Sequence, residues 1–380
     1  MKKRILACIV CLCVVLSIAQ TIVFAAEERV TIIDDNGFRV WSDDGKEFIK
    51  RTSSTEGNAV VFDQSGTYYV TGSPSNYRII VSADGVIIVL NGATIKPTTP
   101  GAAIGVAEEC AEETKVTIML SEGTENEVSG YNDDGISNLG RKLKIVGDGT
   151  LYAKGGSCGA GIGGGQGGNG SNITISDNAT VNVTGGKEAA GIGGGRRGNG
   201  SNITISGSAK VYATGGYEKT NWVYTAFKVH KGVLCTNMSK SGKDEIYYIS
   251  DNAAGIGGGY RGNGSNITIS GNPTIEVTSG KNGFGFGNGL DSTFQSNITI
   301  SGGTIITSDC KPFSNTPNLS GYKSPEIWLN GEKHYYPHDD MFIKDAPKFE
   351  IKPAASVSPS TDVPSASNTS GSTDSSDLMD

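Results

Sequence analysis

The stretch Ala160–Ser176, which reads AGIGGGQGGNGSNITIS, decides the fold of this 380-residue chain. It returns as AGIGGGRRGNGSNITIS at Ala190–Ser206 and as AGIGGGYRGNGSNITIS at Ala254–Ser270. A fourth copy of its last six residues lies at Ser296–Ser301, and successive copies of SNITIS are separated by 30, 64 and 31 residues. The chain is therefore built from a repeat of about thirty residues, and an insertion accounts for the long middle step.

Each repeat contains three short apolar segments that suit β-strands. The first lies in AGIGGG, the second is SNITIS, and the third is an alternating run at 180–184, 210–214, 274–278 or 304–308. Alternation with a period of two residues buries one face of a strand. The pattern predicts that Ile173, Ile175, Val181 and Val183 point inward and that Asn172, Thr174 and Asn182 point outward.

No single repeat has enough apolar surface to fold alone, so the repeats must bury their inner faces by stacking. We therefore predict an all-β fold, a right-handed single-stranded parallel β-helix (a solenoid) of about seven coils with three short strands per coil. Ile162, Ile192, Ile256 and Phe286 are expected to form an inward stack. The chain has 55 glycines, and those beside this stack are expected to adopt positive φ or to let backbones approach closely.

The segments outside the repeats predict a modular organisation. Residues 1–25 have a basic start, an apolar core and small residues before Ala26, as in a cleaved signal peptide. We expect an N-terminal cap at 26–65, the parallel β-helix at 66–311, a C-terminal cap at 312–352 and a disordered tail rich in Ser, Thr and Pro at 353–380.

The long middle step predicts an inserted hairpin at 217–250. Two aromatic, alternating runs, Trp222–Val229 and Glu245–Ile249, would form its strands. The hairpin could pack against the side of the solenoid in a structural role, or it could form one wall of a binding groove.

Charge and cysteine content exclude several classes of function. Loss of the three basic residues in the signal changes the formal charge from −7 to −10, so nucleic-acid binding is not expected. The apolar core of the signal is too short to span a bilayer, so we expect a secreted, extracellular or cell-surface monomer with no membrane span after cleavage. The mature chain keeps Cys110, Cys158, Cys235 and Cys310, whose spacing matches no zinc or redox motif and leaves any disulfide pairing open.

A longer stretch, from Gly66 to about Ser308, resembles a family of clostridial cell-surface carbohydrate-binding β-helix proteins. The residues that carry the resemblance are, in order, GTYYVTGSPS (66–75), RIIVSADGVIIVLNGATI (78–95), GAAIGV (101–106), KVTIMLSEGTENEVSG (115–130), DGISN (134–138) and KLKIVGDGTLYAKGG (142–156). The resemblance implies a right-handed parallel β-helix that looks like a polysaccharide lyase without the lyase activity. It also implies binding of plant cell-wall polysaccharide, cellulosic or pectic, and calcium ions in the helix.

Stacked repeats place like positions side by side, which predicts two candidate columns for a glycan. The first contains Arg196 and Tyr260, with Arg197 and Arg261 beside them. Arginine can donate paired hydrogen bonds to carboxylates or vicinal hydroxyls, and a tyrosine face can accept a sugar ring. A solvated turn is the alternative interpretation of this column.

The second column contains Tyr152, Asn182, Tyr212, Glu276 and Ile306, flanked mainly by threonines. A flat face with aromatic side chains suits an extended polysaccharide, although exposed tyrosines are also common on ordinary strands. A third face repeats Asn, Thr and Ser. This repetition favours a structural role. The face matches the threonine ladder of an ice-binding surface poorly, because asparagine and serine interrupt the threonines.

The repeats supply no pair of stacked carboxylates of the kind that glycoside hydrolysis requires. Asp148 and Asp177, offset by one residue on adjacent coils, are the best candidate ligands for Ca²⁺. A calcium-dependent polysaccharide lyase, with Arg196 or Arg197 as the base, is therefore the alternative to a non-catalytic polysaccharide-binding protein. A surface adhesin or structural spacer is a further alternative.

Overall fold

The computed structural model describes residues 26–35, 37–53, 57–73, 76–216, 219–220, 229–230, 233–234, 249–250, 253–279, 283–292, 296–334, 340–343 and 346–354. The predicted signal peptide, nearly all of the predicted tail and most of the predicted inserted hairpin lie outside these residues. At the base of the insertion, β21 (Lys219–Thr220) pairs antiparallel with β24 (Ile249–Ser250). Within it, β22 (Val229–His230) pairs antiparallel with β23 (Val233–Leu234).

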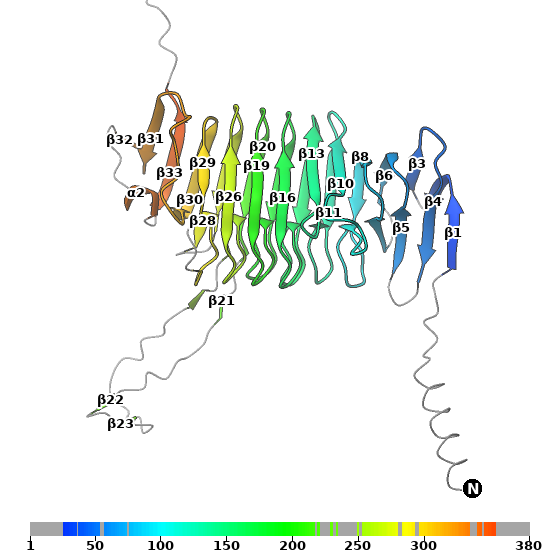
Figure 1. Ribbon diagram of the computed structural model, residues 1–380, viewed down its shortest axis with the longest axis horizontal. Coiled ribbons are helices and arrows are strands. Elements are labelled where there is room, and N and C mark those ends of the chain that lie inside the picture. Colours follow the sequence, from blue (N-terminus) through cyan, green and yellow to red (C-terminus); the bar gives the residue numbers. More distant parts are fainter. Residues whose placement is uncertain are drawn as a thin grey trace, which may run out of the picture.

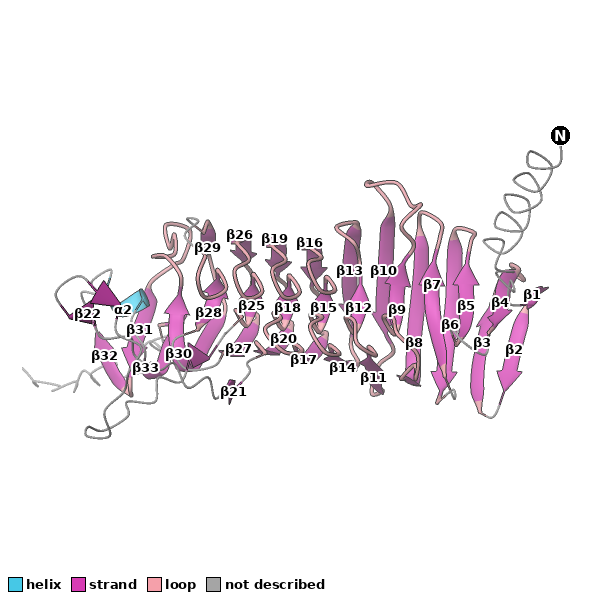
Figure 2. Cartoon of the chain, turned by 90° about the horizontal axis from the view of Figure 1, so that it is seen from below, coloured by secondary structure: helices cyan, strands magenta, loops and turns pink. Residues whose placement is uncertain are grey.

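The described chain is all-β, with one four-residue helix, α2 (Asp340–Ile343), and a mostly parallel sheet of 29 strands. The strands lie side by side along the long axis of the molecule in chain order, as Figures 1 and 2 show. They belong to three ladders, here called A, B and C, and each repeat adds one strand to each ladder.

Ladder A contains the AGIGGG strands and their equivalents. Its strands are β1 (Ala26–Val30), β4 (Phe48–Thr52), β5 (Asn58–Phe62), β7 (Tyr77–Val81), β9 (Ile104–Val106), β12 (Ile136–Ser137), β15 (Ile162–Gly163), β18 (Ile192–Gly193), β25 (Ile256–Gly257) and β28 (Phe284–Gly287).

Ladder B contains the SNITIS strands. Its strands are β2 (Ile32–Asp35), β3 (Phe38–Ser42), β6 (Gly66–Gly72), the first half of β8 (Val86–Ile95), β10 (Lys115–Leu120), β13 (Lys142–Gly147), β16 (Gly170–Ile175), β19 (Gly200–Ile205), β26 (Gly264–Ile269) and β29 (Ile298–Ile300).

Ladder C contains the third strand of each repeat. Its strands are the second half of β8, β11 (Glu125–Ser129), β14 (Thr150–Lys154), β17 (Thr180–Thr184), β20 (Lys210–Thr214), β27 (Thr274–Thr278), β30 (Thr304–Phe313), β31 (Pro325–Leu329), β32 (Glu332–His334) and β33 (Ala346–Pro353). The last residues of β30 also pair with β28 and so extend ladder A.

The inward stack predicted from the sequence is confirmed. Ile162 pairs with Ile192, Ile192 with Ile256, and Ile256 with Phe286, all in parallel register. Each of these side chains is fully buried. The predicted alternation in ladders B and C is also confirmed, since Ile173, Ile175, Val181 and Val183 belong to the same core.

Glycine is required beside this stack because the backbones approach closely. Gly163 has φ 141°, and a Cβ atom placed on it would lie 2.0 Å from the carbonyl oxygen of Gly193. Gly193 and Gly257 repeat the arrangement one strand further on each time. The AGIGGG pattern is thus explained by packing of backbone against backbone.

The parallel ladders end in antiparallel strands on both sides. At the N-terminal end β1 pairs with β4, and β2 with β3. At the other end β33 covers β30 in antiparallel register. Antiparallel strands of this kind protect the ladder edges against pairing with other chains.

No two of the described cysteines are joined in a disulfide. Cys110 and Cys310 are buried and Cys158 is half-buried. Cys235 lies outside the described residues.

Replacement of Ile192 by alanine tests the stack. The side chain is fully buried between its two partners, so its truncation leaves a cavity and should lower the free energy of unfolding by about 2 to 5 kcal/mol. Thr184→Ala, on the exposed side of β17, is the control and should change it by less than about 0.5 kcal/mol. Chaotrope-induced unfolding measures both, and equal effects would contradict the inward placement of Ile192.

Candidate functional site: the tyrosine face

The outward side of ladder C is a candidate binding surface, here called the tyrosine face and defined by Tyr152, Asn182, Tyr212 and Glu276. The strand register confirms the predicted column, because these four residues pair in order across β14, β17, β20 and β27. Tyr152 is 42% exposed, and Tyr212 is half-buried. The column therefore presents two aromatic side chains to solvent on one continuous face.

The two tyrosines are separated by two strand spacings, which is about 10 Å along the ladder. Hydroxyl groups and two lysines flank them. The flanking residues, which pair in register, are Thr150, Thr180, Lys210, Thr274 and Thr304 on one side and Lys154, Thr184, Thr214, Thr278 and Ser308 on the other. A tyrosine ring offers an apolar surface and threonine offers a donor and an acceptor, so the face can contact both the rings and the hydroxyls of a sugar chain.

An ion pair lies at the N-terminal end of the tyrosine face. Lys96 Nζ lies 2.5 Å from Glu127 Oε2, and Glu127 pairs in register with Tyr152. This ion pair neutralises the acid next to Tyr152 along the column, whereas Lys154 and Lys210 are exposed two residues away from Tyr152 and Tyr212 on their strands. The face therefore offers ring surfaces, hydroxyls and ammonium groups to a ligand.

Arg196, predicted in the first glycan column, is held by an ion pair. Its Nε contacts the carboxylate of Glu188, which is 1% exposed and belongs to the turn before β18. A buried carboxylate needs a cationic partner, so this pair serves the fold of the turn. Glu188 has no acidic counterpart in the neighbouring repeats, so the repeat pattern did not reveal this pair. Arg196 was therefore predicted to lie on an edge where it could bind a ligand.

Tyr260, predicted to accept a sugar ring, is only 6% exposed, so that expectation does not hold. Its hydroxyl donates a hydrogen bond to Asp291 Oδ2 at 3.0 Å. The guanidinium of Arg261 lies 4.9 Å from the ring centroid, and its Nε is 3.7 Å from the same carboxylate oxygen. The ring is thus covered, and Arg261 is engaged with residues of the next repeat.

Arg197 remains exposed at the end of this column. Its backbone has φ 63°, and its N–H donates to the carbonyl oxygen of Tyr260 at 2.9 Å. Of the predicted residues in the first column, Arg197 alone has an exposed guanidinium without an ion-pair partner among the described residues. The three-guanidinium edge expected from the sequence is therefore reduced to one free group.

Asp148 and Asp177, the predicted calcium ligands, lie in the turns between ladders B and C. Asp148 Oδ1 accepts a hydrogen bond from Asn178 Nδ2 at 2.6 Å. Asp177 has φ 60°, and Ser176 Oγ lies 3.3 Å from its Oδ1. In the described part of the chain, no three His, Cys, Asp or Glu side chains meet in a group able to hold a metal ion.

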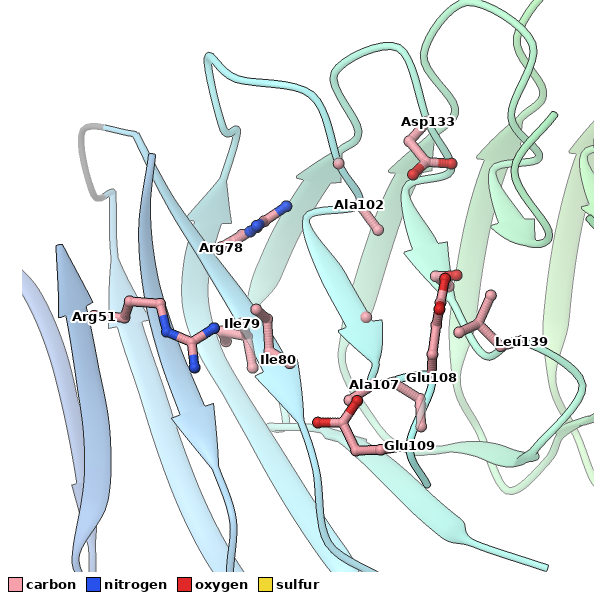
Figure 3. Close-up of a pocket in the computed structure, with 14 residues that line it drawn as sticks. Arg51, Arg78, Ile79, Ile80, Ala102, Ala107, Glu108, Glu109, Asp133 and Leu139 are labelled. Atoms are coloured by element: carbon pink, nitrogen blue, oxygen red, sulfur yellow. The ribbon is translucent and has the colours of Figure 1, made fainter. Parts of the chain in front are cut away.

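Sequence analysis missed a concavity of about 380 Å³ on ladder A, which Figure 3 shows. Arg51 of β4 and Arg78 of β7 lie on one side of it, and Glu108, Glu109 and Asp133 lie on the other. The two arginines belong to the first strands of the ladder, where the repeat is weakest. No repeat pattern therefore pointed to their meeting with the three acids.

Asp134 is a buried carboxyl group in a column of alanines. It precedes Ile136 by two residues, as Ala102, Ala160 and Ala190 precede their own isoleucines in register. Asp134 is 0% exposed, and neither of its carboxylate oxygens has a hydrogen-bond partner among the described residues. Burial, followed by the charge of Asp133, raises the pKa of Asp134 well above its ordinary value.

One of the comparisons with known proteins found a match to part of the chain. Residues 56–197 match the sequence model of a family described as carbohydrate-binding domain-containing protein. The matched segment includes Tyr152, Arg196 and Arg197 and ends before Tyr212. Neither the curated proteins nor the solved structures include a significant match. The described part of the chain has no apolar helix of the length needed to cross a membrane.

The buried carboxyl of Asp134 should make stability depend on pH. Because its pKa is raised in the folded state, the stability that it contributes is complete below the ordinary pKa of 3.8 and is lost as pH rises towards the folded value. Asp134→Asn removes the ionisation. At pH 7 we expect the free energy of unfolding of this variant to exceed that of the unmodified protein by about 1 kcal/mol or more.

Unfolding measured between pH 3 and pH 8 tests this expectation, with the exposed Asp177→Asn as the control. The gain from Asp134→Asn should grow as pH rises above 4, while the control should run parallel to the unmodified protein. A gain for Asp134→Asn that is the same at pH 3 and pH 8 would contradict the assignment.

Proposed function

We propose that this chain is an extracellular, monomeric, non-catalytic polysaccharide-binding protein that recognises glycans of the plant cell-wall type, cellulosic or pectic. In this proposal the three ladders are the sides of a right-handed parallel β-helix of about seven coils. Residues 1–25 direct export and are removed before Ala26. The family match over residues 56–197 supports the carbohydrate partner.

The observation that carries the proposal is the tyrosine face. Two tyrosines stand in one column of a continuous parallel ladder, and each has a threonine on one side and a lysine on the other. An extended polysaccharide presents ring faces and hydroxyls at regular intervals, as this ladder presents aromatic rings and hydroxyls. Many modest contacts along the rod would then bind several sugar units at once.

The lack of paired carboxylates on the tyrosine face supports a non-catalytic role. Among its defining residues, Glu276 is the sole acid, and its in-register neighbours are Tyr212 and Ile306. The next acid in the column, Glu350, pairs in register with Ile306 and lies within ion-pair distance of Lys348 and Lys352. Hydrolysis needs two carboxyl groups on the same ligand path, one of them able to donate a proton, and the two lysines favour the ionised form of Glu350.

A calcium-dependent polysaccharide lyase is the second candidate function. The concavity of Figure 3 favours it, because Arg51 and Arg78 face Glu108, Glu109 and Asp133 across one site. An arginine could remove a proton from a uronate bound in this site. Ultraviolet absorbance from unsaturated uronate ends, measured with polygalacturonate and calcium, would identify this activity, and a flat trace would exclude it.

The double substitution Tyr152→Ala/Tyr212→Ala tests the binding surface. Loss of both aromatic side chains should weaken binding to the recognised polysaccharide by about tenfold or more, because exposed aromatic anchors dominate such contacts. Pull-down on insoluble cellulose and affinity electrophoresis in polygalacturonate, each with and without calcium, would measure the change.

Tyr131→Ala is the matched control, because Tyr131 is 45% exposed and lies in the turn after β11, outside the tyrosine face. It should bind as the unmodified protein does. Absence of binding to every polysaccharide by the unmodified chain would overturn the proposed function. Equal losses in the control and the double variant would remove the tyrosine face as its site.

A further inference from the structure

Ladder B carries a second surface, whose charge is opposite to that of the whole chain. A groove of about 400 Å³ crosses β10, β13, β16 and β19 on the outward side of this ladder. Three exposed lysines line it, Lys115, Lys142 and Lys144, and no acidic residue does. The chain has a formal charge of −7, so this concentration of cations is local.

The nearby acids leave positive charge uncompensated. Lys142 Nζ pairs with the carboxylate of Glu113, which stays 82% exposed. Asp84 Oδ1 accepts a hydrogen bond at 2.7 Å from the backbone N–H of Lys115, so this carboxylate is engaged with the main chain. Lys144 has no acidic partner among the described residues, and its ammonium group is available to a ligand.

The far wall of the groove is held rigid by an asparagine ladder. Asn172 Nδ2 donates to the carbonyl oxygen of Gly140 at 2.7 Å, and Asn202 Nδ2 donates to Asn172 Oδ1 at 2.9 Å. These amides are fixed by one another. The hydroxyls of Thr117 and Thr174, which line the same groove, have no hydrogen-bond partner within the described residues.

The spacing and type of the cations indicate the ligand. Lys115 and Lys142 pair in register on neighbouring strands, about 4.8 Å apart at the backbone, and Lys142 and Lys144 are about 7 Å apart on one strand. Lysine acts as a compact point charge that binds phosphate, and arginine presents a planar fork that fits carboxylate and phosphate alike. A groove with three lysines, two threonines and no acidic side chain favours an anionic polymer that also carries hydroxyl groups.

We propose that this groove binds a polymer whose hydroxylated units are joined by phosphodiester groups. The lysines receive the phosphates, and the threonine hydroxyls contact the polyol or sugar units between them. The site goes beyond the function proposed above, because it lies on ladder B and shares no residue with the tyrosine face on ladder C.

Titration of the mature chain with poly(glycerol phosphate) tests the proposal. Lys115→Gln/Lys144→Gln should weaken this binding by about tenfold at low salt, because long-range attraction to the polyanion is lost. The matched control, Lys154→Gln/Lys210→Gln, removes the same charge from exposed positions on ladder C and should stay within about twofold of the unmodified protein. Raising the salt concentration should weaken binding of the polymer to the unmodified protein more than binding to the Lys115→Gln/Lys144→Gln variant.

Three results would overturn the proposal: no binding of the phosphate polymer, equal losses in the two double variants, or equally tight binding of polygalacturonate to the groove. The two proposed surfaces can fail separately. Tyr152→Ala/Tyr212→Ala should leave binding of the phosphate polymer unchanged, and Lys115→Gln/Lys144→Gln should leave binding to cellulose unchanged.

Discussion

The structure depends on in-register parallel pairing between like strands of successive repeats. Ile162, Ile192 and Ile256 stack because the backbone hydrogen bonds of ladder A align identical positions, and the glycines that follow them allow the chains to come close. Each repeat buries its apolar face against its neighbours, so neither the core nor the surface exists in one repeat alone. A substitution in one strand therefore changes the packing of the strands on both sides.

The same register turns the surface into columns of equivalent residues. Where the column residue is a threonine or an asparagine, the repeats produce a regular polar face, such as the linked amides of Asn172 and Asn202. Where one repeat differs, a local feature appears. Asp134 replaces a buried alanine, and the tyrosines of ladder C alternate with Asn182. The recognition surfaces proposed above arise from such departures within an otherwise uniform frame.

Much of the fold could be predicted because the repeat fixes which residues become neighbours. The inward isoleucines, the column with Tyr152 and Tyr212 and the need for glycine all follow from a period of about thirty residues. The burial of Tyr260 could not be predicted in this way, since its hydrogen-bond partner Asp291 lies in a repeat whose sequence has diverged. Arg196 likewise pairs with Glu188 inside its own repeat, and the arginines and acids of Figure 3 come from segments outside the strict pattern.

Cross-linking between paired positions tests the central claim most directly. In a chain whose four mature cysteines are replaced by serine, Thr184→Cys and Thr214→Cys would place two thiols on neighbouring strands of ladder C in exact register. Neighbouring strands lie about 4.8 Å apart, within the range for a disulfide, whereas Thr184→Cys with Thr278→Cys would span about 10 Å. The account predicts rapid oxidation of the first pair and none of the second, and failure of the first pair to cross-link would contradict the stacking of like positions.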